Sequence, residues 1–176
     1  MEATVARMVE LIRDVPGFPN PGVTFKDLTP LLADPVALNE CVGGLAAPFT
    51  GSRVDKVIGI EARGFILAAP VALALGAGFV PVRKAGKLPW HVHSETYDLE
   101  YGTDTLEIHK DAVGPDDRVL VVDDVLATGG TAAATAKLLG HLGAAPVGFA
   151  CVVELGFLSG RQRLGQIDVH SLVTYG

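Results

Sequence analysis

Hydrophobic and polar positions alternate along this chain in patterns that predict helices and strands in turn. Over residues 4–15 the apolar side chains recur at helical spacing, which predicts an amphipathic helix ended by the following Pro-Gly pair. Residues 18–30 contain three prolines and a glycine, which predicts a rigid loop rather than a regular element. Asp34, followed directly by proline, predicts the cap of a second helix that runs to about residue 45.

The rest of the chain alternates apolar strands with helices. Short continuous apolar runs predict buried strands at 54–60, 79–82, 119–122 and 146–153, helical stretches follow at 65–75 and 132–142, and alternating polarity predicts a half-exposed edge strand at 167–174. This order predicts an α/β fold: a single doubly wound domain over residues 1–176, with a mainly parallel sheet flanked by helices. We expect a small N-terminal hood of about residues 1–35.

One connection is too long for a compact α/β domain. Residues 84–110 separate two predicted elements, and within them Thr96–Glu100 and Thr105–His109 could pair as a β-hairpin. Long insertions of this kind often close over a binding site. We therefore predict a long, flexible β-hairpin lid over about residues 84–110.

Composition narrows the class of protein. The chain has 176 residues, 49% hydrophobic and 19% charged, which is typical of a globular domain with a sizeable core. The net charge of −6 and the lack of a basic block argue against a nucleic-acid partner. The sequence has no signal-peptide pattern and no apolar run of about 18 residues, so no membrane segment is predicted. Cys41 and Cys151 stand apart without metal or redox spacing, which favours a reducing cytoplasm.

The strand predicted at 119–122 leads into a candidate anion site. Asp123 and Asp124 follow where that strand should end, and Ala127–Thr131 (ATGGT) then precedes an Ala-rich helix. The glycines allow close backbone approach to an oxyanion, and the helix start offers free N–H groups. Carboxylates beside a phosphate site suit a ligand that also carries a ribose diol. No Gly-Lys-Ser/Thr follows, so the stretch is not a Walker P-loop.

Two further charged segments follow predicted strands. Arg63, in the turn after strand 54–60, could fork onto a phosphate or form an ion pair with Glu61 or Asp55. Arg83, Lys84 and Lys87 follow strand 79–82, and they could contact an anion or stand as solvated charges. Because carboxyl ends of parallel strands meet at one sheet edge, these segments point to one site.

Other residues allow both a structural and a functional interpretation. Phe25 could anchor the core beneath its loop or stack on a planar ligand. Glu100 could be a solvated hairpin acid. His91 and His93 have no third ligand at supporting spacing, so an exposed loop is the better interpretation, and no protein metal site is assigned.

Several motifs resemble a known family. VVDDVLATGGT resembles the phosphoribosyl-diphosphate (PRPP) signature of the type I phosphoribosyltransferases. FPNPGVTFKDLTPLL, GIEARGF, RKAGKLP and LEYG, in this order and spacing, resemble the adenine phosphoribosyltransferases. Hypoxanthine-guanine and orotate enzymes share the PRPP loop but lack the proline-rich opening with its Phe-Lys pair.

The resemblance implies Mg²⁺-dependent transfer of a 5-phosphoribosyl group from PRPP to N9 of adenine, giving AMP and pyrophosphate. It also implies a homodimer. Two alternatives stay open: a xanthine or guanine phosphoribosyltransferase, and a PRPP-sensing regulator that binds nucleic acid. The acidic charge disfavours the regulator.

The same resemblance assigns roles to residues. It implies catalytic roles for Glu100, as the proton donor or acceptor at adenine N7, and for Arg63. It implies adenine binding by Thr24, Phe25 and Lys26, PRPP binding by Asp123, Asp124, Ala127, Thr128, Gly129, Gly130 and Thr131, and pyrophosphate binding by Glu61, Ala62, Arg63, Arg83, Lys84 and Lys87. A non-proline cis peptide is expected at Glu61–Ala62, and Mg²⁺ is expected on PRPP and water rather than on protein ligands.

Overall fold

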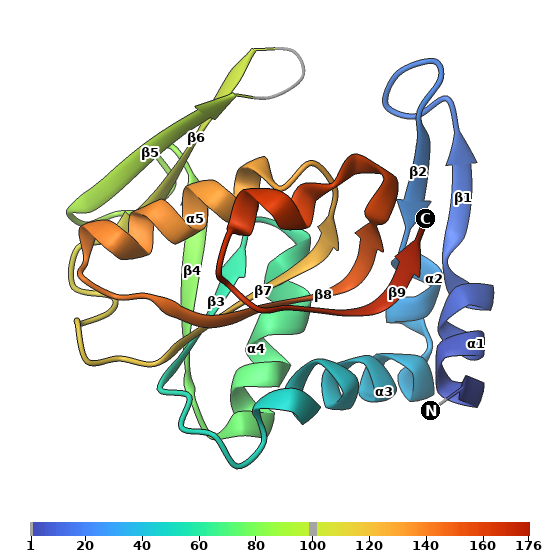
Figure 1. The fold of residues 1–176 in the computed structure, drawn as a ribbon, viewed down its shortest axis with the longest axis horizontal. Helices are drawn as coiled ribbons and strands as arrows, with labels where there is room; N and C mark the ends of the chain where they lie inside the picture. The colour runs from blue at the N-terminus through green and yellow to red at the C-terminus, as the bar shows by residue number, and fades with distance from the viewer. Residues whose placement is uncertain (1, 99–101) are drawn as a thin grey trace.

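A seven-stranded sheet forms the centre of the molecule (Figure 1). The computed structural model describes residues 2–98 and 102–176. In spatial order the strands are β5 (Val92–Asp98), β6 (Thr103–His109), β4 (Gly78–Lys84), β3 (Lys56–Ile60), β7 (Val119–Leu126), β8 (Pro146–Leu155) and β9 (Val169–Tyr175). The last five in this order run parallel to one another, and β5 and β6 join antiparallel. The predicted mainly parallel sheet is confirmed, with β9 at its edge.

Helices cover both faces of the sheet. The helices α1 (Glu2–Leu11), α2 (Thr29–Ala33), α3 (Pro35–Ala46) and α4 (Arg63–Leu75) share one core with the sheet, whereas α5 (Gly130–His141) packs in the other. Adjacent strand residues divide between the two cores: Val57 lies in the first and Ile58 in the second, as the alternation of a strand requires. This confirms the doubly wound fold. Among the described residues, no helix is both long enough and apolar enough to cross a membrane.

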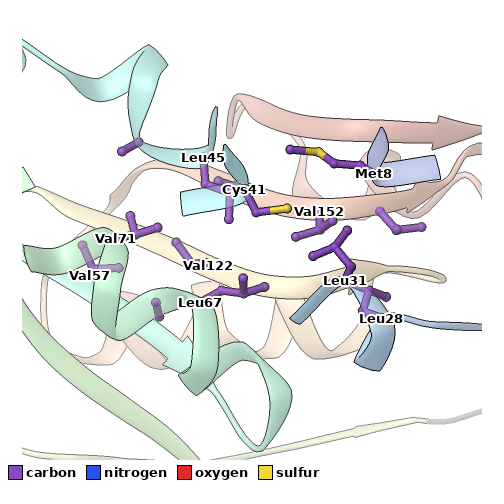
Figure 2. Close-up of a cluster of buried hydrophobic side chains, with 14 of the residues drawn as sticks. Met8, Leu28, Leu31, Cys41, Leu45, Val57, Leu67, Val71, Val122 and Val152 are labelled. Atoms are coloured by element: carbon purple, nitrogen blue, oxygen red, sulfur yellow. The ribbon is translucent and has the colours of Figure 1, made fainter. Parts of the chain in front are cut away.

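The first core holds the sheet rigidly (Figure 2). Leu31 of α2, Cys41 of α3 and Leu67 of α4 are fully buried, and Figure 2 shows them beside Val122 of β7. Burying each large aliphatic side chain contributes about 1.5–3 kcal/mol. Helices packed this tightly hold the strands, and therefore fix the carboxyl edge where the candidate site residues lie.

The N-terminal prediction was wrong in two places. The first helix ends at Leu11 rather than at the Pro-Gly pair, and Arg13–Pro16 forms β1. Within the predicted loop, Thr24–Asp27 forms β2, which pairs antiparallel with β1, and α2 begins soon after. Pro19, Pro21 and the positive-φ Gly17 and Gly22 lie in the connection between β1 and β2, and Pro30 lies in α2, so none of them prevents the two strands from pairing. The predicted cap of α3 is confirmed, because the Asp34 carboxylate accepts from the backbone N–H of Val36 and Ala37.

The predicted hairpin is present as β5 and β6, with different limits. Asp98 pairs with Thr103, so β5 ends before Glu100, which lies outside the described residues. β6 also pairs with β4, so the hairpin extends the main sheet and rises beyond it in Figure 1. His93 lies in β5 with its ring 5.6 Å from that of His141, and is not in an exposed loop.

The central strand is longer than its apolar run indicated. β7 continues to Leu126, so Asp123 and Asp124 lie inside the strand rather than after it. Asp123 is paired with Cys151 of β8, and Val125 with Val153. Hydrogen bonding between parallel neighbours therefore extends the strand through residues that its polarity would have ended.

Candidate functional site

The segment between β7 and α5 forms a cradle suited to a phosphate. This phosphate loop, Ala127–Thr131, passes through Gly129 at φ +80° before α5 begins at Gly130. Among the described residues no side chain caps α5, so its first backbone N–H groups remain available to a ligand. The loop lines a hollow together with Asp123 and Phe149. Free N–H groups at a helix start bind anions, so the predicted loop has the geometry of a phosphate site.

The two acids of β7 lie beside this loop in different surroundings. Asp124 is 5% exposed, and its carboxylate accepts a hydrogen bond from Nε of Arg63. Asp123 accepts from the backbone N–H of Asp124 at 2.9 Å. Burial, reinforced by the neighbouring Asp124 charge, holds the pKa of Asp123 well above its usual range. The pair therefore offers one carboxylate already partnered by a cation and one whose charged form is disfavoured by burial.

Arg63 connects three parts of the site. Its ion-pair partner is Asp124 rather than Glu61 or Asp55, and its guanidinium lies 5.2 Å from the centre of the Phe25 ring. Gly64 allows this approach, because a Cβ there would lie 2.8 Å from Oδ1 of Asp123. The start of α4 therefore lies directly against the two acids.

Glu61 gathers the basic segment after β4. Its carboxylate contacts Nε of Arg83 and Nζ of Lys87 at 3.2 Å each, and accepts from the backbone N–H of Lys84 at 3.0 Å. Burial raises the pKa of Glu61, but these hydrogen bonds outweigh it and hold the pKa below its usual value. Nζ of Lys84 lies 3.0 Å from Asp104. Glu61 thus collects the side chains of Arg83 and Lys87, whereas that of Lys84 lies on Asp104. The peptide bond between Glu61 and Ala62 is cis, as the family resemblance implies.

Phe25 lies outside the core, next to Arg63. Its side chain is partly buried, outside the two core clusters formed by the described residues. It meets Phe18 edge-to-face at 5.3 Å, and Arg63 lies over its ring. The interpretation of Phe25 as a core anchor was wrong.

The side chain of Lys26 is held away from Phe25 by two partners. Nζ of Lys26 lies 2.5 Å from the carboxylate of Asp14 and 3.8 Å from the centre of the Tyr175 ring. Lys26 and Asp14 are cross-strand partners in β1 and β2, and Tyr175 ends β9. With the neighbouring Thr24 side chain exposed, what this strand presents at the site is mainly backbone and the Phe25 ring.

The hairpin also contacts the phosphate loop. Thr131 donates a hydrogen bond to the Tyr97 hydroxyl at 3.4 Å, and a Cβ at Gly130 would lie 3.4 Å from the Tyr97 ring. Burial raises the pKa of Tyr97. The hairpin therefore contacts the phosphate loop through Tyr97.

Sequence reasoning missed the turn that follows β8, which comprises η2 (Gly156–Leu158) and η3 (Gly160–Leu164). Gly160 of this turn packs on the backbone of the phosphate loop, where a Cβ would lie 2.1 Å from the carbonyl oxygen of Ala127. A glycine within a polar turn carries no signal of such a contact, because its partner lies on another element.

Metal ligands are few in this region. Across residues 2–98 and 102–176, no three His, Cys, Asp or Glu side chains are grouped as a metal ion would need. The oxygen donors nearest the phosphate loop are Asp123 and Asp124, of which Asp124 is bound to Arg63. Mg²⁺ is usually bound by one or two carboxylates plus phosphate oxygens and water, so these donors fit a metal that arrives with a polyphosphate substrate.

Comparison with known proteins gives a consistent result. Residues 44–170 match the family model of the phosphoribosyl transferase domain. Adenine phosphoribosyltransferase of Thermobifida fusca is 54% identical over 175 residues, covering 99% of each chain. The crystal structure of the enzyme from Rhodothermus marinus superposes with a TM-score of 0.94 at 49% identity, covering 99% of this chain and 100% of that one. The enzyme from Saccharomyces cerevisiae, solved with adenine and an imino-altritol bisphosphate, gives 0.93 at 38% identity, covering 98% and 100%.

Proposed function

We infer from the adenine phosphoribosyltransferase family, to which this chain belongs, that it transfers the 5-phosphoribosyl group of PRPP to N9 of adenine, giving AMP and pyrophosphate. One observation carries the assignment of the site. Arg63 bridges Phe25, on the side proposed for the base, and Asp124, on the side proposed for the ribose. The sides proposed for the base and for the ribose therefore meet at one residue.

The phosphate loop would hold the 5-phosphate. Its backbone N–H groups and the hydroxyls of Thr128 and Thr131 would donate to the phosphate oxygens. Departure of pyrophosphate builds positive charge on the ribose, as in glycoside cleavage. Asp123 and Asp124 would accept hydrogen bonds from the ribose hydroxyls and stabilise that charge.

The cations gathered by Glu61 would receive the pyrophosphate. Arg83 and Lys87 already lie on the Glu61 carboxylate, so little reorganisation would be needed for them to neutralise the leaving group, and Lys84 would turn from Asp104 to join them. Glu61 would act by holding these cations rather than by contacting pyrophosphate directly. Mg²⁺, bound to PRPP oxygens and water, would add further neutralisation. Arg63 follows the Glu61–Ala62 segment directly. When a ribose diol binds to Asp124 in place of Arg63, the Arg63 guanidinium would turn to the pyrophosphate.

Adenine would stack on Phe25. Because the Lys26 ammonium is directed at Asp14 and Tyr175, the amino-bearing edge of adenine would be read by the backbone of Thr24 and Lys26 rather than by side chains. Backbone N–H and C=O groups at fixed positions can distinguish an amino group from an oxo group. Selectivity for adenine over guanine, hypoxanthine or xanthine would then come from these backbone groups.

Glu100 would exchange the proton at adenine N7 as N9 attacks the sugar. It lies outside the described residues, between β5 and β6, in the hairpin proposed to close as a lid. General acid–base groups contribute about 10²–10⁴-fold to rate, so Glu100→Gln should slow the single-turnover step by that order and change PRPP affinity little. An unchanged single-turnover rate in Glu100→Gln would rule out a role for Glu100 in proton transfer.

A homodimer would cover an apolar stripe on α4. Ile66 and Leu73, seven positions apart on one helical face, are 48% and 83% exposed. Sedimentation at low protein concentration tests this proposal, and Leu73→Glu should favour monomers if this stripe is the interface. A cytoplasmic location is proposed on the ground that Cys41 and Cys151 are both free and buried.

The decisive assay presents PRPP and Mg²⁺ with adenine, hypoxanthine, guanine and xanthine in turn. We expect adenine to give the highest kcat/KM and to yield AMP and pyrophosphate in equal amounts. Omission of Mg²⁺, with chelator present, should abolish turnover. Faster turnover of any oxopurine would overturn the assignment of adenine as acceptor.

A further inference from the structure

The turn after β8, residues 156–164, touches the phosphate loop backbone to backbone. A Cβ on Gly160 would lie 2.1 Å from the carbonyl oxygen of Ala127 and 2.9 Å from the backbone N of Gly129. A Cβ on Gly129 would lie 2.3 Å from the carbonyl oxygen of Gly160. Neither position has room for a side chain, so the shape of the loop depends on where Gly160 lies.

Arg161, the next residue, anchors this turn to the sheet. Its Nε and Nη2 donate to the two carboxylate oxygens of Glu154 at 2.9 and 2.5 Å, and its Nη1 donates to the carbonyl oxygen of Val169 at 2.9 Å. Glu154, at the end of β8, is 6% exposed and also accepts from the Ser171 hydroxyl at 2.9 Å. A bidentate guanidinium–carboxylate pair fixes orientation as well as distance. The Arg161 bond also holds the pKa of Glu154 below its usual value.

The turn is fixed on the far side of Gly160 as well. Leu164 is 5% exposed and packs in the core that contains α5. Ser159, just before Gly160, has φ +54°, a left-handed conformation that is uncommon for a residue with a side chain. Contacts on both sides of Gly160 therefore hold a backbone shape that the sequence alone would not favour.

A phosphate site made of backbone N–H groups depends on the position of that backbone. No long side chain of the loop can adjust its reach, so movement of the loop by about 1 Å can cost about 100-fold in activity. All three guanidinium nitrogens of Arg161 donate within the protein, so the guanidinium is held on Glu154 and on the carbonyl oxygen of Val169.

We propose that Arg161 is a positioning residue for the 5-phosphate: through its fork on Glu154 it holds Gly160 against Ala127 and Gly129. The phosphate loop is thereby set in its binding shape before PRPP arrives. This inference rests on the proposed function, because it takes the loop to bind the 5-phosphate of PRPP.

The test separates the two substrates. In Arg161→Met we expect the KM for PRPP and the Kd for ribose 5-phosphate, measured by calorimetry, to rise by about 10- to 100-fold, and the KM for adenine to change less than about twofold. Arg161→Lys keeps the charge but loses the bidentate contact with Glu154. It should give a smaller rise in the KM for PRPP and in the Kd for ribose 5-phosphate. Glu154→Gln should resemble Arg161→Lys. The Glu154→Gln/Arg161→Met double variant should raise the KM for PRPP and the Kd for ribose 5-phosphate no further than Arg161→Met alone.

Arg53→Met is the matched control. Nε of Arg53 lies 2.8 Å from the carboxylate of Asp55, just before β3 and at the opposite end of the sheet from the loop. This variant should leave the KM for PRPP and ribose 5-phosphate binding unchanged, whatever it does to Tm.

Equal changes in the KM for PRPP and for adenine in Arg161→Met, or no change in either, would overturn the proposal and leave Arg161 a structural residue only. Ribose 5-phosphate binding keeps this test distinct from that of the proposed function. Absence of adenine turnover in the unaltered protein would overturn the proposed function, whereas loss of ribose 5-phosphate binding in Arg161→Met would still support positioning.

Discussion

The two ends of the site are built in opposite ways. At the phosphate end, the loop joins a central strand to a long helix and is packed on both sides by other backbone. At the base end, Phe25 lies on a separate two-stranded sheet, β1 and β2, which stands beside the main sheet in Figure 1. The phosphate end is fixed by the core, whereas the base end is fixed by a few side-chain contacts.

This difference suits what each end is proposed to bind. A phosphate is small, compact and strongly charged, so it is best held by preset N–H groups that need no movement. A purine is flat and must enter and leave, so an aromatic side chain on a less buried hairpin can adjust to it. We therefore expect variants at the phosphate end to have larger effects than variants at the base end.

The largest effect is expected for Asp124→Ala. It removes the partner of Arg63 and the proposed acceptor of the ribose hydroxyls, and losing one partner of a buried charge pair costs about 2–5 kcal/mol, or about 30-fold and more. Steady-state kinetics should show this loss in kcat/KM for PRPP. Asp116→Ala, an exposed acid before β7, is the control. Unchanged PRPP kinetics would contradict the proposed contact between the two acids and the ribose hydroxyls.

Phe25→Leu should have a smaller effect, confined to the base. Loss of stacking on an aromatic face is worth about 1–2 kcal/mol, so the KM for adenine should rise about tenfold while that for PRPP stays within about twofold. Phe79→Leu, which alters a second edge-to-face pair with Phe65 at 5.9 Å, is the control. A rise in the KM for PRPP alone would show that the two ends are not independent.

A still smaller effect is expected for Tyr175→Leu. Its ring holds the Lys26 ammonium, and cation–π contacts contribute about 0.5–1 kcal/mol, so the KM for adenine should rise about threefold. Tyr175→Phe keeps the ring and should behave as the unaltered protein. If both variants raise the KM for adenine equally, the hydroxyl rather than the ring is what matters.

The smallest change is a pH dependence at the phosphate end. Since the folded pKa of Glu154 is lowered from 4.5 by its bond with Arg161, its contribution to stability is present above pH 4.5 and is lost as pH falls through the folded pKa. The Tm of the unaltered protein should exceed that of Glu154→Gln by about 2–4 °C at neutral pH. Calorimetry below pH 4.5 should show this gap narrowing, and a gap that widens in acid would contradict the assignment.

The same contrast explains what could be predicted from the sequence. The phosphate end was recognisable because strand, acids, glycines and helix are consecutive, so local order already implies the site. At the base end, Phe25 could be identified only through the family resemblance, and its strand was taken for a loop because the prolines nearby suggested no regular structure. Pro19 and Pro21 lie in the connection and Pro30 lies in α2, so they do not interrupt the pairing of β1 with β2.

The features that could not be predicted from the sequence depend on contacts between distant segments. Gly160 and Arg161 were missed because their roles depend on tertiary packing that no local pattern carries. The strand limit at Val122 was wrong for a related reason: pairing with β8 extends β7 through two acids that local polarity would exclude.

The position of those acids inside β7 has a further consequence, for aggregation during folding. β7 pairs in parallel with β3 on one side and with β8 on the other, and each partner is reached through a long crossover connection, so these pairings form slowly. Until then its apolar residues are exposed as an unpaired strand, a common starting point for association between chains. Asp123 and Asp124 interrupt that run with charge, as gatekeeper residues do. We therefore expect the two carboxylates to keep the strand from self-association before they serve the ribose.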